Sequence, residues 1–309
     1  MMLRRFVSSV IGALLLLTAF PSVVQAQSDA AAPDTAGAWT FDLSGKLSGS
    51  QAAYKDWQEG GLNTVSLTTS IDGTAQNTTN RWTQTHDLRL GFGIIQSEDD
   101  EEDEPLRKSA DLIQAQTNLR YRGNGFFRRF KPTISARLRT QFAKGFDYTN
   151  NPFPDGAPQA DEDPPVQTSE FFAPAFITET VGLTYNPKEW YTVRLSAASK
   201  QTVVRDRSLG VLYDIDPGET SRVEAGAELA ATFSREIFPN VRYKSRANVF
   251  FSFNQTENPP DVLWENYITM QVNSWLTTDL EFVALFDENT TDAIQLKEVL
   301  SVGVTFLLI

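Results

Sequence analysis

Twelve segments of this chain alternate apolar and polar residues with a period of two, which limits the possible folds more than any other feature. Successive side chains of a β-strand point to opposite sides of the sheet. Residues 132–142 show the pattern most clearly. Their apolar face holds Ile134, Ala136, Leu138, Thr140 and Phe142, and their polar face holds Thr133, Ser135, Arg137, Arg139 and Gln141. Such segments are expected to form strands with one apolar and one polar surface.

The connections between the segments alternate in character. The second, sixth, eighth and tenth are brief, whereas the third, fifth and seventh are long or strongly polar. Outer-membrane barrels show this asymmetry, with short periplasmic turns and longer external loops, and an even number of strands leaves both termini in the periplasm. We therefore predict an all-β fold over residues 39–309, an up-and-down antiparallel transmembrane barrel of about twelve strands in the cell outer membrane.

A secreted β-sandwich is the competing fold, because its strands also alternate. Sandwich strands usually hold about 5–6 residues, and the segments of this chain keep their alternation for longer. Two sites conflict with a purely apolar outer surface. Glu179 lies on the outward row of its strand, and Gln84 and His86 lie on that of theirs. Either these residues lie near a membrane interface, or a β-bulge exchanges the faces.

The N-terminal residues have the features of a secretory signal. Arg4 and Arg5 precede an apolar stretch at residues 11–17, and Val24-Gln25-Ala26 forms a cleavage site with small residues. We predict a signal peptide at residues 1–26 and a disordered tail at residues 27–38. The apolar stretch is too short for a membrane helix, which needs about 20 apolar residues, and no later stretch approaches that length.

Composition excludes several classes of function. The net charge of −12 disfavours nucleic acid as a partner, because phosphates require basic patches, and the absence of cysteine excludes thiolate chemistry. We predict no cofactor and no metal site. Residues 98–104 are seven consecutive acidic residues, which are expected to form a solvated external loop. Capture of cations outside the membrane is the alternative role of this run.

Several short motifs resemble a family of bacterial outer-membrane barrel proteins known as the domain of unknown function DUF3078. The motifs are WQEGGLN at residues 57–63, KSAD at 108–111, TQFAKGF at 140–146, FAPA at 172–175 and QLKEVLSVG at 295–303. Together they extend over nearly all of the chain after the predicted signal. The resemblance implies a bacterium with a periplasm and a location in the outer membrane. It implies no activity, because the family is uncharacterised.

Charged residues on the inward rows are the candidates for function. The predicted lumen-lining residues are Arg120, Arg137, Arg139, Arg194, Lys200, Arg222, Glu224, Glu228, Arg242, Lys244 and Arg246. One interpretation is a structural plug, in which opposed charges bridge and close a narrow lumen. The other is a water-filled pore with a basic wall, since arginine suits carboxylate and phosphate and rings of charge determine selectivity.

An enzyme is the third class of function. Some outer-membrane barrels of this size are lipid hydrolases, and His86, the only histidine, has the outward parity that such an enzyme would need. A hydrolase also requires a nucleophile beside its base, an orienting partner and an oxyanion hole. No serine lies two residues from His86, so we predict no catalytic residues and no enzyme.

The first connection contains Trp57, Gly60 and Gly61, which suit either a ligand-facing loop or a tight turn with one anchoring ring. The leading functional hypothesis is a channel or transporter for small polar or anionic solutes. The alternative is a structural or docking barrel whose lumen is closed by ion pairs. The expected partners are outer-membrane lipid, the barrel assembly machinery and small polar solutes, and we expect a monomer.

Overall fold

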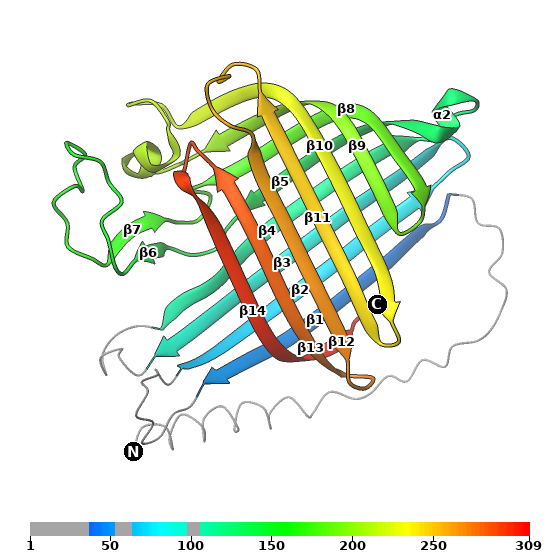
Figure 1. The fold of residues 1–309 in the computed structure, drawn as a ribbon, viewed down its shortest axis with the longest axis horizontal. Coiled ribbons are helices and arrows are strands. Elements are labelled where there is room, and N and C mark those ends of the chain that lie inside the picture. The colour runs from blue at the N-terminus through cyan, green and yellow to red at the C-terminus, as the bar shows by residue number, and fades with distance from the viewer. Residues whose placement is uncertain (1–36, 53–63, 98–105) are drawn as a thin grey trace. The chain divides into compact units, whose positions relative to one another are not determined.

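The computed structural model describes residues 37–52, 64–97 and 106–309. Within these residues, twelve antiparallel strands form a closed barrel, and β1 pairs with β14 to close it (Figure 1). The barrel strands are β1 (Trp39–Ala52), β2 (Thr64–Thr78), β3 (Trp82–Ser97), β4 (Arg107–Tyr121), β5 (Phe130–Thr140), β8 (Ala175–Lys188), β9 (Tyr191–Val203), β10 (Ser221–Phe238), β11 (Val241–Ser252), β12 (Asp261–Gln271), β13 (Leu276–Asp287) and β14 (Thr291–Leu307). The predicted twelve-stranded barrel is confirmed.

The register of the strands gives the barrel an apolar outer face and a polar inner face. In β5, Ile134 is 53% exposed on the outer face, whereas the preceding residue, Thr133, is 2% exposed on the inner face. Thr140 is an exception, because it has outward parity but is buried. Its hydroxyl donates to the backbone oxygen of Pro174 at 2.9 Å, so the chain that leads into β8 covers it.

Two strand boundaries differ from the prediction for identifiable reasons. β5 ends at Thr140 instead of residue 142, because the Asp111 carboxylate accepts hydrogen bonds from the amides of Phe142 and Ala143, at 2.7 and 2.9 Å. β10 extends to Phe238 instead of residue 233, because its last residues pair with β11 across a two-residue turn. Asn240 has a φ of 63° in that turn, a conformation that asparagine tolerates well.

The barrel has two different ends. One carries the short turns, including the single helical turn α2 (Phe126–Arg129), and we call it the turn end. The other carries the long connections, and we call it the loop end. There, the long connection at residues 144–173 contains the strands β6 (Gly145–Asp147) and β7 (Val166–Ser169), and the next long connection contains the 3₁₀-helix η2 (Arg207–Tyr213).

These two connections share a small apolar core. Its buried members include Phe153, Val166, Val204, Leu209 and Ile215. Burial of apolar surface stabilises both connections as a packed layer at the loop end, despite their content of proline and aspartate. No helix among the described residues is long and apolar enough to cross a membrane.

Several predicted features lie outside the described residues. They are the signal peptide at residues 1–26, the tail up to residue 36, the loop residues Trp57, Gly60 and Gly61, and the acidic run at 98–104. Gly37, at the end of the predicted tail, donates its amide to the backbone oxygen of Thr78 at 2.9 Å. That residue therefore lies beside the turn end of β2.

The burial of Asp111 leads to a testable prediction about stability. Its side chain is 2% exposed and also pairs with Lys108 at 3.0 Å. Asp111→Ala should lower the free energy of unfolding in urea by about 2 kcal/mol, because it removes the charged acceptor of two backbone amides and the ion-pair partner of Lys108. Asp163→Ala is the control, since Asp163 is exposed at the loop end and makes no ion pair or side-chain hydrogen bond within the described residues. Equal unfolding free energies for the two variants would contradict this role of Asp111.

Candidate functional site

The strand register places all eleven predicted lumen residues on the inner face of the barrel. Glu224 and Glu228 on β10 are each 1% exposed, and Arg194 and Lys200 on β9 are also buried. A buried carboxylate is tolerable only when it is paired and hydrogen-bonded. The contacts of these side chains therefore determine what the lumen can do.

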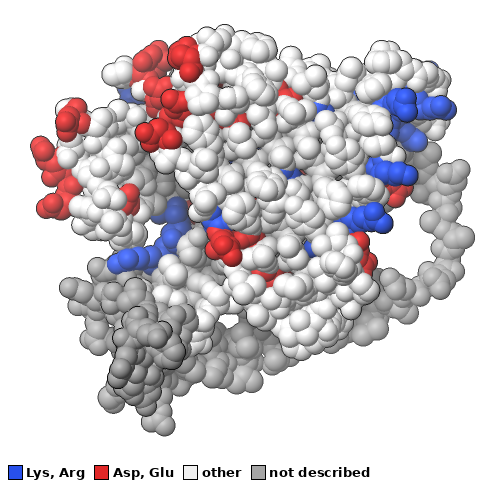
Figure 2. Space-filling model, in the orientation of Figure 1, with Lys and Arg blue, Asp and Glu red and all other residues white. Residues whose placement is uncertain are grey.

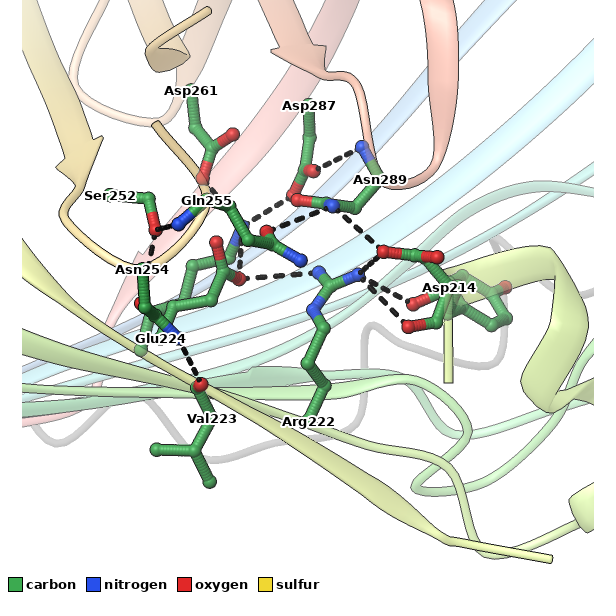
Figure 3. A network of polar contacts seen from close by, with 12 residues as sticks. Asp214, Arg222, Val223, Glu224, Ser252, Asn254, Gln255, Asp261, Asp287 and Asn289 are labelled. Atoms are coloured by element: carbon green, nitrogen blue, oxygen red, sulfur yellow. Dashed lines mark hydrogen bonds and ion pairs between the residues drawn. The ribbon is translucent and has the colours of Figure 1, made fainter. Parts of the chain in front are cut away.

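At the loop end, Lys200 lies among three carboxylates from three other strands. Its Nζ atom is 2.5 Å from Asp261, 2.7 Å from Asp287 and 3.5 Å from Glu224. Arg222 extends this group, because it contacts Glu224 at 3.2 Å and Asp214 at 3.0 Å (Figure 3). We call this set the loop-end network. It links β9, β10, β12, β13 and the chain after η2.

Halfway along the lumen, Glu228 accepts hydrogen bonds from two arginines. Arg137 of β5 donates at 2.7 Å and Arg194 of β9 at 3.0 Å. Each arginine also holds an asparagine on a further strand: Arg137 donates to Asn248 at 2.9 Å, and Arg194 donates to Asn118 at 3.0 Å. We call these five residues the middle network. Charge-assisted hydrogen bonds of this kind are the stronger ones in proteins.

A third group crosses the lumen between opposite walls. Arg89 of β3 lies 3.3 Å from Glu265 of β12 and donates to the Tyr267 hydroxyl at 2.8 Å. On one side of the barrel, β3 and β12 are separated by β2, β1, β14 and β13. Tyr267 also contacts Glu281, which pairs with Lys297 at 3.1 Å. These residues form the cross-lumen network, which constricts the lumen in this structure.

Sequence reasoning did not select Arg89 or Glu265 as candidates. Arg89 lies between Leu88 and Leu90, which are outward residues, so its inward parity was available from the sequence. Glu265 similarly follows Trp264, which is exposed on the outer face. The signal that could have identified them was period-two parity. Their contact across the barrel was not available, because it depends on which strands face each other.

The remaining inner-face cations give the lumen a positive excess. Arg120, Lys244, Arg246 and Arg242 make no ion pair or hydrogen bond within the described residues. In the middle of the lumen and near its turn end, the inward basic residues thus outnumber the carboxylates that contact them. Near the turn end, Asp279 pairs with Lys46 and accepts from Thr269 at 2.8 Å. Cations without ion-pair partners attract anions into a narrow passage whose walls have a low dielectric constant.

A cavity of about 360 Å³ lies between the loop-end and middle networks. Its wall combines charged groups with apolar side chains, including Phe176, Phe250, Leu263 and Leu285. The charged residues that line it are Asp111, Arg137, Arg139, Lys200, Glu228, Asp261 and Asp287. All of them except Arg139 make ion pairs within the described residues.

Arg139 is therefore the cavity cation that remains available to a ligand. Glu265 interacts electrostatically with Arg139, but it already contacts Arg89 at 3.3 Å. Tyr213 of η2 also lines the cavity, and its hydroxyl donates to the backbone oxygen of Thr168 at 2.9 Å. Burial raises the pKa of Tyr213 to about 12, so this hydroxyl remains a hydrogen-bond donor at neutral pH.

The residues that conflicted with a purely apolar outer face remain on that face. His86 pairs in register with Ala75, and no bulge occurs near it. Its ring stacks on Trp39 at 5.7 Å between centroids, and its nitrogens contact Gln84 and Thr117, each at 3.0 Å. Because Trp39 belongs to the aromatic residues at the turn end, this position fits an interface rather than a change of face.

Glu179 also remains on the outer face, where Gln201 donates to it at 3.4 Å.

Within the described part of the chain, no group of three or more histidine, cysteine, aspartate or glutamate residues is placed to hold a metal ion. The carboxylates of the loop-end network surround Lys200 instead. The His86 ring hydrogen-bonds to Gln84 and Thr117, and neither contact is a serine or a carboxylate. These contacts do not test whether the protein is an enzyme, and the expectation that it is not an enzyme stays a prediction.

Comparison with known proteins returns barrels of low sequence identity. No curated protein matches the chain at a significant level. An outer membrane channel from Pseudomonas putida F1 is 12% identical over 90% of this chain and 99% of that chain, with a TM-score of 0.39. The translocator domain of the autotransporter NalP from Neisseria meningitidis is 11% identical over 97% of this chain and 95% of that chain, with a TM-score of 0.33.

A family model gives the more specific match. It covers residues 50–146, which extend from the end of β1 to β6 and include three of the motifs at full length, WQEGGLN, KSAD and TQFAKGF. Over residues 50–146 the chain matches the family described as protein of unknown function DUF3078, which confirms the resemblance inferred from its motifs.

Proposed function

We propose that this protein is an outer-membrane β-barrel that binds a small organic anion in the cavity and passes it through a lumen gated by exchangeable ion pairs. The observation that carries the proposal is Arg139, which lines a partly apolar cavity and makes no ion pair or hydrogen bond within the described residues. Guanidinium binds carboxylate with two parallel hydrogen bonds. The apolar wall favours a ligand with a hydrocarbon body.

The membrane location rests on the outer face of the barrel. Apolar side chains such as Leu195, Val181 and Leu296 are exposed there, and a soluble protein would bury a surface of this extent. On the face in Figure 2, most of the acidic residues gather at the loop end and a group of basic residues lies at the turn end, and the surface between them is mostly uncharged apart from a small charged group near its centre. Aromatic contacts recur near the turn end, as in Trp82–Tyr121, Phe130–Tyr185 and Phe233–Tyr243.

The inner face supports a hydrated passage more than a dry plug. Polar atoms that are buried without a hydrogen-bond partner include Nε of Arg120 and of Arg194 and the hydroxyls of Thr180 and Ser196. An unsatisfied buried polar group costs about 1–3 kcal/mol, a cost that water in the lumen would remove. A lumen that holds water between its ion pairs can admit a solute when those pairs exchange partners.

A structural barrel is the second candidate, and the cross-lumen network favours it. Arg89, Glu265 and Tyr267 connect opposite walls, so they constrict the lumen and brace the barrel. In this alternative the ion pairs do not exchange, and the loop-end layer binds a partner. A measurement of conductance separates the two functions.

Removal of the cross-lumen contact should open the passage. In planar bilayers we expect low conductance for the native protein and several-fold higher conductance for Arg89→Ala/Glu265→Ala, which removes both charges together. The control is Lys46→Ala/Asp279→Ala, because this pair joins β1 and β13 near the turn end, with only β14 between them. Native and doubly substituted barrels that are equally silent would favour the structural alternative.

Arg139 should determine anion binding. We expect Arg139→Gln to weaken hexanoate binding by about 10–100-fold in titration calorimetry, since a hydrogen bond to a charged group contributes about 1.5–3 kcal/mol. Arg242→Gln is the matched control, because Arg242 has inward parity and no partner but lies at the turn end, outside the cavity. Equal affinities of the two variants would remove Arg139 from the binding site.

The membrane location has its own test. Leu195→Arg places a charge on the apolar outer wall of the barrel. Val211→Arg places a charge at an exposed position of η2, which belongs to the loop-end layer. In phospholipid vesicles the first substitution should lower the free energy of unfolding by up to about 2–4 kcal/mol, because arginine is costly on a lipid-facing strand. The second should change it little. Similar small effects of both substitutions would mean that the wall does not contact hydrocarbon.

A further inference from the structure

The contact that closes the barrel is much shorter than the strands that make it. β1 and β14 pair only through residues 44–49 and 302–307. β1 nevertheless continues to Ala52, where it still pairs with β2, and β14 begins at Thr291, where it pairs with β13. Toward the loop end the two strands diverge, as β1 (blue) and β14 (red) show in Figure 1. Within the described residues, the edge of β14 over residues 291–301 has no partner on the β1 side.

An unpaired strand edge is unfavourable in hydrocarbon. Backbone amides and carbonyls that lack partners cost several kcal/mol each in a bilayer, and irregular or open edges occur there only where they line water or protein. The outward side chains of this part of β14, including Ile294, Leu296 and Leu300, are exposed and apolar, although Glu298 interrupts their row. The apolar outer side chains indicate that this edge lies at a depth where the wall contacts lipid, where it is tolerated only beside water, a ligand or further protein.

Two inner side chains of β14 are accessible in the part of the strand that has no described partner on the β1 side. The Lys297 side chain is 41% exposed although it pairs with Glu281, and Gln295 is exposed. Glu228, on a strand paired along both edges, is 1% exposed. Lys297 and Gln295 both lie on the part of β14 that borders the short β1–β14 seam.

The cavity extends toward this seam. Leu263, Leu285 and Gln295 all line it. They also form one row across β12, β13 and β14, because Leu263 pairs with Leu285 and Leu285 with Gln295. This row begins in the apolar part of the cavity and ends at the unpaired edge.

We propose that the β1–β14 seam is a lateral entrance through which an amphipathic organic anion moves from the outer leaflet into the cavity. Its hydrocarbon body lies along Leu263 and Leu285, and its anionic group is held by Arg139. The proposal rests on the proposed anion site, but the entrance can be tested separately from binding.

The first experiment tests the entrance without a ligand. Because the chain has no cysteine, Gln295→Cys can be labelled with bimane in phosphatidylcholine vesicles that contain nitroxide-labelled lipid. We expect at least threefold stronger quenching than for Leu263→Cys, which lies in the same row, two strands from the seam, on a strand paired along both edges. Equal quenching by lipid at both positions would overturn the proposal.

The second experiment tests whether the entrance carries the ligand. Ser50→Cys/Ser301→Cys, joined by oxidation or by a short bismaleimide, connects the strands just beyond their last paired residues. Binding of membrane-dissolved dansyl-undecanoate should slow at least tenfold. The matched control is Leu47→Cys/Val304→Cys, which connects residues that are already paired and should leave the rate unchanged. An unchanged rate in the first bridged variant would exclude the seam as the route.

The outcomes separate the entrance from the site. Hexanoate enters from water, so the bridged barrel should bind it with unchanged affinity. If the native barrel binds no hexanoate, the anion site fails, whereas lipid quenching at Gln295→Cys still decides whether the seam is open. If hexanoate binds and the quenching is absent, the site stands and the lateral entrance fails.

Discussion

Backbone hydrogen bonding between neighbouring strands is the constraint on which the rest of this structure depends. Each strand of the barrel pairs along both edges except at the seam, where β1 and β14 share only residues 44–49 and 302–307. Closure fixes which side chains face inward, because strand side chains alternate. The buried charges on β9 and β10 are a consequence of that closure, and so is the exposed apolar wall.

The interior charges are organised by the curvature of the barrel rather than by their order in the chain. Glu228 meets Arg137 of β5 and Arg194 of β9, and Arg89 reaches Glu265 on the opposite wall. Single removal of a partner from such a pair leaves a buried charge, which is strongly destabilising. This physical situation explains why the lumen can be both polar and constricted, and why Arg139, which has no such pair within the described residues, is the cation of the proposed anion site.

The short seam connects the closure of the barrel to the cavity. Gln295 and Lys297, inner residues of β14 beside the seam, are accessible. The cavity and the seam share the row of Leu263, Leu285 and Gln295. The proposed entrance and the proposed anion site therefore lie on one continuous row of side chains, which is apolar at Leu263 and Leu285 and polar at Gln295.

Local patterns in the sequence predict about twelve strands and their two faces, and the Pro239-Asn240 pair is typical of a turn. These features are local, because a period of two and a turn residue such as Asn240 act within a few positions. The inward parity of Arg137, Arg139 and Glu228 followed from the same local rule. The motifs also identified the family that residues 50–146 match.

Which inward charges meet depends on the tertiary structure. Arg89 and Glu265 are 176 positions apart, and their contact depends on the number, tilt and stagger of all the strands between them. The early end of β5 likewise depends on Asp111 of the neighbouring strand, and the packed loop layer depends on contact between two separate connections. Local periodicity cannot encode such contacts, because closure of the sheet is a collective property of twelve strands.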